Sequence, residues 1–372
     1  MRAQLLTAYN TPYTLTTTAP LPTPTHPHDL LIRVAAASFC HTDAVLTSGH
    51  MPGFPSTLPH VGSHEFAGTI ISHAPHPSTL AASLLPGTRV GVPGRPYGAC
   101  GACAECAKAA GNAQDDDGEG YSVYCARADN CGVSVDGGFR EYALVDARQV
   151  AVLPAGMGSV DAAVLMCAGV TVWGALKRCA VPSGGRVGIV GCGGGLGHLG
   201  MRFAAGLGLR VVGVESADGP LAVARGLGTG ARVVDARVEA AEGVVEEMGR
   251  EDGRAERGHM GVDAVIILPE SQEAFDYGMA LLRTHGKCVV VSFPEKGFHV
   301  SARDVVFRDI TIMGSLVGSN KTMREMLDFA EKHQIKANIR TFPLEELNKL
   351  VEEYHKGQGG KLVVDMSLKV GS

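Results

Sequence analysis

A cluster of glycines follows a short apolar segment in the middle of the chain. The segment, residues 186–190, is typical of a buried strand, and residues 196–207 have the spacing of a helix. Glycines in a turn between a strand and a helix let a pyrophosphate approach the helix N-terminus. This unit predicts an α/β domain that binds a dinucleotide. The candidate cofactor-binding positions in the turn are Gly191, Gly193, Gly194, Gly195, Leu196 and Gly197.

The spacing of these glycines departs from the usual G-x-G-x-x-G pattern. Counted from Gly191, the turn is one residue longer, and only Gly195, Gly197 and Gly200 fit the pattern literally, too far into the predicted helix. Glu215 supports the prediction because it ends the next predicted strand, where a carboxylate binds the adenosine ribose and repels a 2′-phosphate. We therefore expect NAD rather than NADP, with a solvated loop acid as the alternative for Glu215.

Strand and helix patterns alternate in the second half of the chain, which predicts a parallel, doubly wound sheet. Residues 1–150 differ, because they are rich in Pro, Gly, Thr and His and contain shorter β-like runs. The fold class is therefore α/β plus β. The runs in the first region are 30–34, 66–72, 88–92 and 139–145, and those in the second are 186–190, 210–214, 231–234, 262–268, 287–293 and 310–313.

Three closely spaced cysteines indicate a metal site. Cys100, Cys103 and Cys106 are three residues apart. Structural Zn²⁺ sites take four Cys or His ligands in a tetrahedron. The fourth ligand is Cys125, with Cys131 as the competing candidate, and a redox-active thiol cluster is the alternative to a metal site. A site closed by four cysteines has no open position, so its predicted role is structural.

A second set of metal-binding residue types is spread along the chain. Cys40, His64 and Cys167 form a set of two cysteines and one histidine, with His60 as the alternative histidine. Each of them alone is more often a buried core residue than a ligand. Together they match a catalytic zinc site, which has three protein ligands and an open fourth position.

Composition excludes several classes of function. The formal net charge of -5 gives no electrostatic case for binding nucleic acid or an anionic membrane. No uninterrupted apolar stretch reaches the ~18 to 20 residues of a membrane span, and residues 1–19 lack the apolar segment of a secretory signal. We therefore expect a cytosolic (cytoplasmic) protein, whose ten cysteines are metal ligands or buried side chains.

Together, these motifs resemble the zinc-containing alcohol dehydrogenases of the medium-chain dehydrogenase/reductase superfamily, most closely their tetrameric microbial branch. The resemblance covers nearly the whole chain. Four segments look like the family's first-ligand segment, its His-Glu signature, its third-ligand helix and a segment near the nicotinamide. These segments are, in that order, 40–43, 61–68, 167–172 and 314–318.

The resemblance implies a GroES-like catalytic domain formed by both ends of the chain, with a Rossmann domain inserted between them. The expected boundaries are residues 1–168, with the structural zinc lobe at residues 95–131, then 169–305 for the Rossmann domain and 306–372 for the return. The family also implies a homo-oligomer, either a dimer or a tetramer.

The resemblance further implies roles for single residues. Thr42 takes the proton from the zinc-bound alcohol, and Glu65 supports the catalytic zinc beside its ligands or as an alternate ligand. Asp43, close to the first ligand, suits an orienting role. Lys361 stands where a basic residue contacts the cofactor pyrophosphate. Further expected cofactor contacts are Leu268, Ser292 and Val317.

Three departures from the family pattern bear on function. The segment 111–124 inserts extra residues before Cys125 and carries three aspartates, so we expect an exposed bulge there. The usual proton-relay histidine falls at Val45, with His50 as the candidate substitute. Met51 aligns with a bulky aromatic of the substrate pocket, and its flexible thioether suggests a larger pocket.

We therefore expect an enzyme that interconverts a primary alcohol and its aldehyde by hydride transfer to or from a nicotinamide cofactor, with two Zn²⁺ per chain. Its expected partner is a small-molecule alcohol or aldehyde. The first alternative, favoured by Val45 and Met51, is a pathway-specific aldehyde or ketone reductase that acts on a bulkier specialised metabolite. The second is a non-catalytic redox sensor that binds zinc and dinucleotide, which the complete open ligand set argues against.

Overall fold

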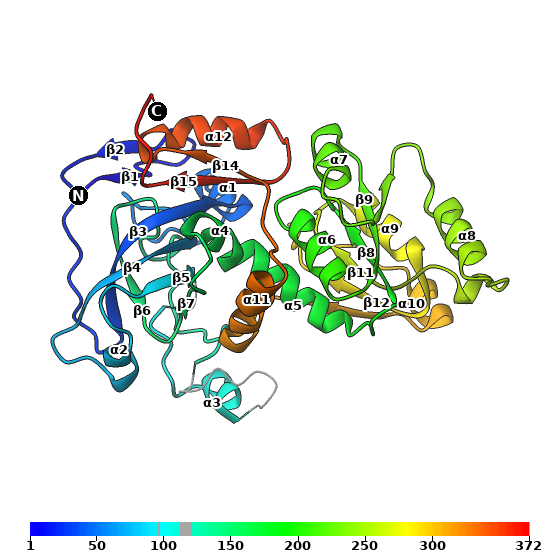
Figure 1. The fold of residues 1–372 in the computed structure, drawn as a ribbon, viewed down its shortest axis with the longest axis horizontal. Helices are drawn as coiled ribbons and strands as arrows, with labels where there is room; N and C mark the ends of the chain where they lie inside the picture. Colours follow the sequence, from blue (N-terminus) through cyan, green and yellow to red (C-terminus); the bar gives the residue numbers. More distant parts are fainter. Residues whose placement is uncertain (95–96, 112–120, 372) are drawn as a thin grey trace.

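The structure is a computed structural model that describes residues 1–94, 97–111 and 121–371. It consists of two lobes (Figure 1). Both termini lie in the first lobe, and the middle of the chain forms the second. The first lobe is therefore built from two segments that are far apart in the sequence.

The first lobe contains a seven-stranded sheet with the order β14-β15-β3-β4-β5-β7, and β6 also pairs with β3. Strand β15 runs antiparallel to β3, with Leu362 opposite Phe39. The C-terminal segment thus brings Lys361 beside the end of β3, which Cys40 follows. The strands are β3 (Asp29–Phe39), β4 (Glu65–His73), β5 (Arg89–Pro93), β6 (Tyr142–Asp146), β7 (Ala151–Val152), β14 (Ile339–Phe342) and β15 (Lys361–Asp365).

The second lobe contains a six-stranded sheet with the order β10-β9-β8-β11-β12-β13, in which all neighbours are parallel. The chain crosses from one side of β8 to the other when β11 forms. Ligands of such sheets bind at this switch point, beyond the carboxyl ends of the strands. The strands are β8 (Arg186–Val190), β9 (Arg210–Glu215), β10 (Arg232–Asp235), β11 (Val262–Ile267), β12 (Leu282–Val290) and β13 (Thr311–Gly314).

Each predicted strand overlaps an observed one, whereas β7, β14 and β15 of the seven-stranded sheet were not predicted. One clear displacement is at β12. This strand begins at Leu282, opposite Val262, and its register shifts before regular pairing starts at Lys287. The sequence prediction, 287–293, therefore missed its irregular first half. Strand β13 follows residue 305, so the six-stranded sheet extends into the segment that we expected to belong to the returning catalytic domain.

Side chains of the second sheet alternate between two hydrophobic cores, as the strand period requires. In β11, Ala264 and Ile266 face the core shared with α5 and α6, whereas Val265 and Ile267 face the core shared with α8 and α9. Both faces are buried, which explains the continuous apolar runs in the sequence. The helices of this lobe are α6 (Gly197–Gly206), α7 (Asp218–Arg225), α8 (Ala241–Glu251), α9 (Gln272–Leu281) and α10 (Ala302–Arg308).

One continuous helical segment joins the two lobes (Figure 1). It consists of α4 (Ser159–Val164), the π-helical η1 (Leu165–Gly169) and α5 (Val170–Cys179). Helix α4 contacts β3, β4 and β15, and α5 contacts β11 and β12. Within the described ranges, this is the one helix long and apolar enough to cross a membrane, and 72% of its apolar window is buried inside the protein. Its buried apolar side chains belong to one hydrophobic core, which includes residues of both lobes.

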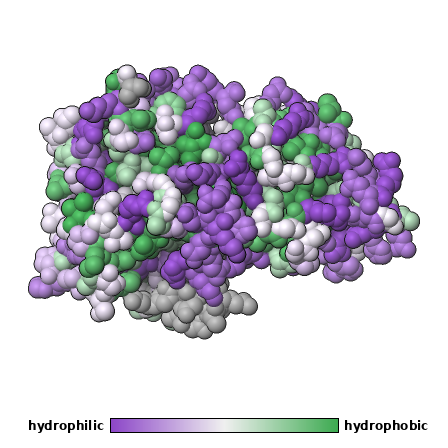
Figure 2. Space-filling model, in the orientation of Figure 1, coloured by the Kyte–Doolittle hydropathy of each residue, from purple (hydrophilic) through white to green (hydrophobic). Residues whose placement is uncertain are grey.

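Most of the remaining elements are short, except α11 (Asn320–Lys332), which packs against α5. Helix α8, at the outer end of the second lobe, buries Val244, Val245 and Met248, and the surface over it is mostly hydrophilic (Figure 2). The other elements are β1 (Ala3–Leu5), β2 (Thr14–Thr16), α1 (His41–Thr47), α2 (Thr79–Ser83), α3 (Ala104–Gly111), η2 (Arg257–His259), η3 (Leu344–Glu346) and α12 (Leu347–His355).

Candidate metal centres and cofactor cleft

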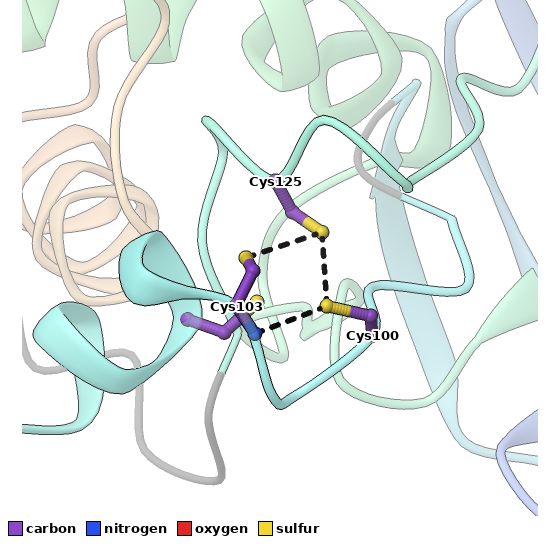
Figure 3. Close-up of side chains that lie close together, drawn as sticks. Cys100, Cys103 and Cys125 are labelled. Carbon is purple, nitrogen blue, oxygen red and sulfur yellow. Dashed lines mark hydrogen bonds between the residues drawn. The ribbon is translucent and has the colours of Figure 1, made fainter.

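Four cysteine thiols converge next to α3, in the segment that we predicted as the structural zinc lobe and call the cysteine lobe below. The sulfurs of Cys100, Cys103, Cys106 and Cys125 all lie within 4.8 Å of one another. Cys125 Sγ is 3.7 Å from Cys100 Sγ and 3.9 Å from Cys103 Sγ (Figure 3). Tetrahedral Zn²⁺ with Zn–S bonds of about 2.3 Å requires sulfurs about 3.8 Å apart. The four thiols therefore fit a structural zinc ion.

Cys131, the competing candidate, lies outside this cluster. It is fully buried and forms an isolated bridge with Val135, and burial raises the pKa of its thiol to about 12. Cys125 is thus the cysteine that the fold brings to the other three. The predicted exposed bulge lies mostly outside the described residues, because it centres on residues 115–117.

The second cluster combines residues from three elements. Cys40 caps the N-terminus of α1 after β3, His64 directly precedes β4, and Cys167 lies in η1 between the lobes. Their ligand atoms are within 4.8 Å of one another, and His64 Nε2 is 3.3 Å from Cys167 Sγ. The structure therefore selects His64 over His60. His60 instead lies with its Nδ1 3.7 Å from Asp136.

A buried carboxylate, Asp43, connects the two ligand segments of the first lobe. Its two oxygens accept hydrogen bonds from the backbone N–H of Cys40 (2.9 Å) and of Ser63 (2.8 Å). Ser63 has a φ of 71°, in the left-handed region, which these bonds help to maintain. Asp43 Oδ2 also lies 3.9 Å from Nδ1 of His64, so Asp43 holds both ligand segments in place.

The charges around this cluster favour a cation. The hydrogen bond from Cys167, together with His64, holds the pKa of Cys40 well below its ordinary value. Burial lowers the pKa of His64, but Cys40, Asp43 and Glu65 outweigh this effect and raise it to about 9. Zn²⁺ would take the place of the proton on His64, which the Cys40 thiolate and the two nearby carboxylates stabilise there in its absence. With a second thiol and an imidazole as donors, the cluster fits a three-ligand zinc site.

Glu65 and Lys361 form a buried ion pair directly behind the cluster. Lys361 Nζ also donates to the carbonyl oxygen of Phe39, at 2.8 Å. Burial raises the pKa of Glu65 to about 7, although Lys361 opposes the shift. The second carboxylate oxygen of Glu65 is buried without a hydrogen-bond partner in the described part of the chain. An oxygen in this state is available to a metal ion.

A cavity of about 700 Å³ runs between the lobes and reaches both the metal cluster and the glycine turn. Cys40 lines it from the first lobe, and Gly194, Gly195 and Leu196 line it from the second. The methylene stem of Lys361 also lines the cavity and lies close to Gly195. One predicted metal ligand, Cys40, and three predicted cofactor positions of the glycine turn thus line the same cavity.

Two further residues of this cleft, His41 and Tyr354, were given no role from the sequence. His41 Nδ1 is 2.8 Å from the hydroxyl of Tyr354, and its Nε2 is 3.7 Å from a carboxylate oxygen of Glu270 in the second lobe. His41 therefore bridges the lobes at the cavity wall. Its position beside Cys40 is a local signal, but its partners are separated from it by more than 200 residues of sequence.

The glycine turn is held so closely that side chains are excluded from it. A Cβ atom on Gly193 would lie 1.8 Å from the carbonyl oxygen of Pro220, and one on Gly197 would lie 2.0 Å from that of Gly191. Glu215, at the end of β9, accepts a hydrogen bond from the Gly193 N–H at 3.2 Å. The turn and the predicted ribose-binding carboxylate are therefore in direct contact.

The other predicted cofactor positions lie at the same edge of the sheet as the glycine turn. Leu268 follows β11, Ser292 follows β12 and Val317 follows β13. The Ser292 hydroxyl donates to the carbonyl oxygen of Pro269 at 2.7 Å. Val317 has a φ of 48°, which is rare for a β-branched residue. These residues meet at the carboxyl edge, where parallel sheets bind cofactors.

The predicted proton-transfer residues lie on and after α1. Thr42 Oγ1 is 3.9 Å from Cys40 Sγ. Val45 lines the cavity, as do Ser48 and His50, and Ser48 Oγ is 2.8 Å from His50 Nδ1. The cavity wall therefore carries a hydroxyl–imidazole pair near the position where the relay histidine was expected.

Known proteins match both lobes. Residues 26–155 match the family model of the alcohol dehydrogenase GroES-like domain, and residues 195–332 match that of the zinc-binding dehydrogenases. The first match covers β3 to β7 of the seven-stranded sheet, and the second covers β9 to β13 of the six-stranded sheet. The GroES-like and Rossmann-type architecture predicted from the sequence is therefore confirmed.

Curated relatives match nearly the full length. The chain is 34% identical to an alcohol dehydrogenase of Geobacillus stearothermophilus over 90% of this chain and 91% of that one. It is 34% identical to alcohol dehydrogenase 1 of Emericella nidulans, over 93% of each chain. The crystal structure of the Aeropyrum pernix alcohol dehydrogenase superposes with a TM-score of 0.81 at 26% identity, covering 98% of this chain and 100% of that one. The chain is thus a zinc-dependent alcohol oxidoreductase and belongs to the zinc-containing alcohol dehydrogenases of the medium-chain dehydrogenase/reductase superfamily.

Proposed function

We propose that this enzyme interconverts a primary alcohol and its aldehyde, with NAD as the hydride carrier and with two Zn²⁺ ions per chain. The observation that carries the proposal is the single cavity lined by both Cys40 and the glycine turn. Hydride transfer requires the substrate and the nicotinamide side by side in one site, and a cavity lined by both a metal ligand and the glycine turn supports such an arrangement.

Zn²⁺ held by Cys40, His64 and Cys167 would supply a Lewis acid for the substrate oxygen. Thr42 is proposed to accept the hydroxyl proton of the alcohol, which its position 3.9 Å from Cys40 Sγ supports. We propose that Glu65 moderates the charge of the zinc site, either from a position next to the zinc ligands or as an alternate ligand itself. Its unpaired carboxylate oxygen supports this role.

The preference for NAD over NADP is proposed from Glu215. Its carboxylate already accepts hydrogen bonds from the N–H groups of Gly193 and Ser216, so it is fixed at the end of β9. A 2′-phosphate at this position would meet a fixed negative charge, whereas ribose hydroxyls would find an acceptor. The pyrophosphate contact of Lys361 stays a prediction, because its ammonium pairs with Glu65 in the structure.

Ser48 and His50 are proposed as the route by which the proton leaves the cleft. Both line the cavity and are within hydrogen-bond distance of each other. Val45, which lines the same wall, has no group that exchanges protons. An imidazole is suited to this role because one ring nitrogen can accept a proton while the other donates one.

A second candidate substrate class is a bulkier aldehyde or ketone. The apolar Val45 in the cavity wall and the flexible Met51 just after α1 favour it. We place it second, because neither residue changes the chemistry of the zinc site.

We propose that the enzyme is a homo-oligomer that associates through the β13 edge of the second lobe. Phe307 is 80% exposed, Val306 71% and Phe293 70%. These residues belong to α10 and to the segment after β12, which flank the last strand of the sheet. An unpaired strand edge beside exposed apolar side chains is typical of a protein interface. A cytosolic location is also proposed, because all ten cysteines are free thiols in the structure.

The test is an assay of the purified protein with a panel of alcohols and aldehydes, from ethanol to polycyclic carbonyls, with NAD(H) and NADP(H). Reduced nicotinamide is measured by absorbance, with and without a zinc chelator. Chelator-sensitive oxidation of short primary alcohols with NAD supports the first proposal. Turnover confined to bulky carbonyls supports the second candidate, and faster turnover with NADP would contradict the role of Glu215.

A further inference from the structure

His198 is a buried titratable residue that neither metal centre uses. It lies in the first turn of α6, directly after the glycine turn, and is completely shielded from solvent. Its Nδ1 is 2.8 Å from the carbonyl oxygen of Gly194, and its Nε2 is 3.2 Å from the backbone nitrogen of Asn338. A carbonyl only accepts and an amide only donates, so the ring is neutral and carries its proton on Nδ1. Burial also lowers the pKa of His198, to about 4.

The two partners of His198 belong to different lobes. Gly194 follows β8 in the second lobe, whereas Asn338 directly precedes β14 in the first. The carbonyl oxygen of Asn338 in turn accepts a hydrogen bond from the backbone N–H of Lys361 at 2.9 Å. Lys361 pairs with Glu65 behind the metal cluster. His198 is therefore part of a connection between the glycine turn and the strand that supports the catalytic centre.

His198 holds the Gly194 carbonyl with two hydrogen bonds. One comes from its ring and the other, at 3.2 Å, from its backbone N–H. In a trans peptide, the carbonyl oxygen of one residue and the N–H of the next point in opposite directions. Because the Gly194 carbonyl points towards α6, the Gly195 N–H points away from the helix. Gly195 lines the cleft, and in the described chain its N–H has no protein acceptor.

We propose that His198 is a positioning residue that orients the Gly194–Gly195 peptide and so directs the Gly195 N–H at the pyrophosphate of the cofactor. Anions bind at helix N-termini through such backbone donors, and a donor contributes most when it is fixed before the ligand arrives. The link to Asn338 fixes the ring from its other side, which makes the peptide orientation depend on the contact between the lobes. This inference rests on the dinucleotide site proposed above.

Two substitutions separate the hydrogen bonds of His198 from its bulk. His198→Gln keeps one donor and one acceptor on a planar group, and His198→Leu removes both. Arg202→Leu is the matched control, because Arg202 lies on the same helix and donates to the side-chain oxygen of Asn338 at 3.4 Å, whereas His198 accepts from the backbone N–H of Asn338. Zinc content and melting temperature of each variant show whether it is folded.

The ligands are ADP-ribose, which carries the pyrophosphate, and adenosine, which lacks it, each titrated against the zinc-loaded protein by calorimetry. We expect His198→Leu to weaken ADP-ribose binding about tenfold, as for loss of one charge-assisted hydrogen bond. Adenosine binding should be unchanged, and His198→Gln and Arg202→Leu should resemble the wild type. In steady-state assays, the KM for NAD should rise in His198→Leu while kcat stays close to that of the wild type.

Three results would overturn the inference. They are unchanged ADP-ribose binding in His198→Leu, an equal loss of ADP-ribose and adenosine binding, and a loss in His198→Gln as large as that in His198→Leu. Failure of the wild-type protein to bind ADP-ribose is a different result. It would refute the proposed cofactor site, and the inference about His198 together with it.

Discussion

The two candidate metal centres of this protein, called the cysteine lobe and the catalytic centre after their proposed roles, are assembled in opposite ways. In the cysteine lobe, Cys100, Cys103 and Cys106 are close neighbours in the sequence, and their thiols meet within one short loop and the start of α3. In the catalytic centre, the ligands come from the ends of two strands and from the helical segment between the lobes. A local set of ligands closes a small loop, whereas the distant set forms only when β3, β4 and the helical segment have packed together.

The two centres also differ in the groups that surround the metal ligands. Four thiolates fill all coordination positions of a zinc ion, so the free energy of zinc binding in the cysteine lobe contributes to folding. The catalytic centre has three ligands and is surrounded by the buried charges of Asp43, Glu65 and Lys361. Buried charges of this kind are costly for stability and are typical of functional sites. The comparison therefore predicts that substitutions in the catalytic centre lower activity, whereas substitutions in the cysteine lobe lower stability.

The largest effect is expected for Cys167→Ala. Loss of this ligand should lower kcat/KM roughly 10³-fold or more, because a metal Lewis acid contributes several kcal/mol to such a reaction. Initial rates of alcohol oxidation and the zinc content per chain are the measurements. Cys179→Ala, a buried thiol on the same helical segment, is the control and should retain both metal ions and activity. Full activity in Cys167→Ala would show that the cluster is not the catalytic centre.

In the cysteine lobe, Cys103→Ser should affect stability instead. We expect Tm to fall by roughly 5 °C or more, since an incomplete structural site no longer contributes metal-binding energy to folding. The kcat of the folded fraction should stay close to that of the wild type. Calorimetry and zinc analysis test this, with Cys131→Ala as the control that keeps both metal ions. A variant with unchanged Tm but lost turnover would reverse the assignment of the two centres.

A smaller, pH-dependent effect is expected on the cofactor side of the catalytic centre. Burial lowers the pKa of His198 from 6.5 to about 4, so the unfolded chain binds a proton more readily than the folded protein does. This contribution to stability is therefore present above pH 6.5 and is lost as the pH falls towards 4. The loss approaches about 3 kcal/mol, at 1.36 kcal/mol for each pH unit of difference.

Unfolding in urea at pH 7 and pH 5 measures this effect. The free energy of unfolding should fall less between the two values in His198→Gln than in the wild type, because glutamine does not titrate. An equal fall in both proteins would mean that other groups determine the acid sensitivity. The same series in Cys103→Ser should follow the wild type, since the cysteine lobe does not contain His198.

The sequence predicted which types of residue form the two centres better than it predicted which individual residues come together. The close spacing of Cys100, Cys103 and Cys106 is a local signal, and so is the strand, glycine turn and helix unit. The choices between Cys125 and Cys131, and between His64 and His60, required the fold. Both members of each pair are nearby in sequence, and only tertiary packing decides which one reaches the other ligands.

Contacts between residues far apart in the sequence had no local signal. Lys361 pairs with Glu65, 296 residues away, and the cysteine ligands give no indication of it. The same holds for His198 and Asn338, which are 140 residues apart. Lys361 was therefore expected at the pyrophosphate alone, because a family pattern gives the position of a charge but not its buried partner.

The smallest effect concerns proton transfer, which has no counterpart in the cysteine lobe. His50→Gln should lower kcat roughly tenfold or more, because a positioned imidazole speeds proton transfer by such factors, and Ser48 holds this one at 2.8 Å. High concentrations of imidazole buffer should restore part of the rate by supplying another proton acceptor. His355→Gln, in the same cavity wall, is the matched control and should leave kcat unchanged. If both variants lose the same activity, or neither does, the proton leaves the cleft by a route that does not include Ser48 and His50. The contrast between the centres would then rest on the metal ligands alone.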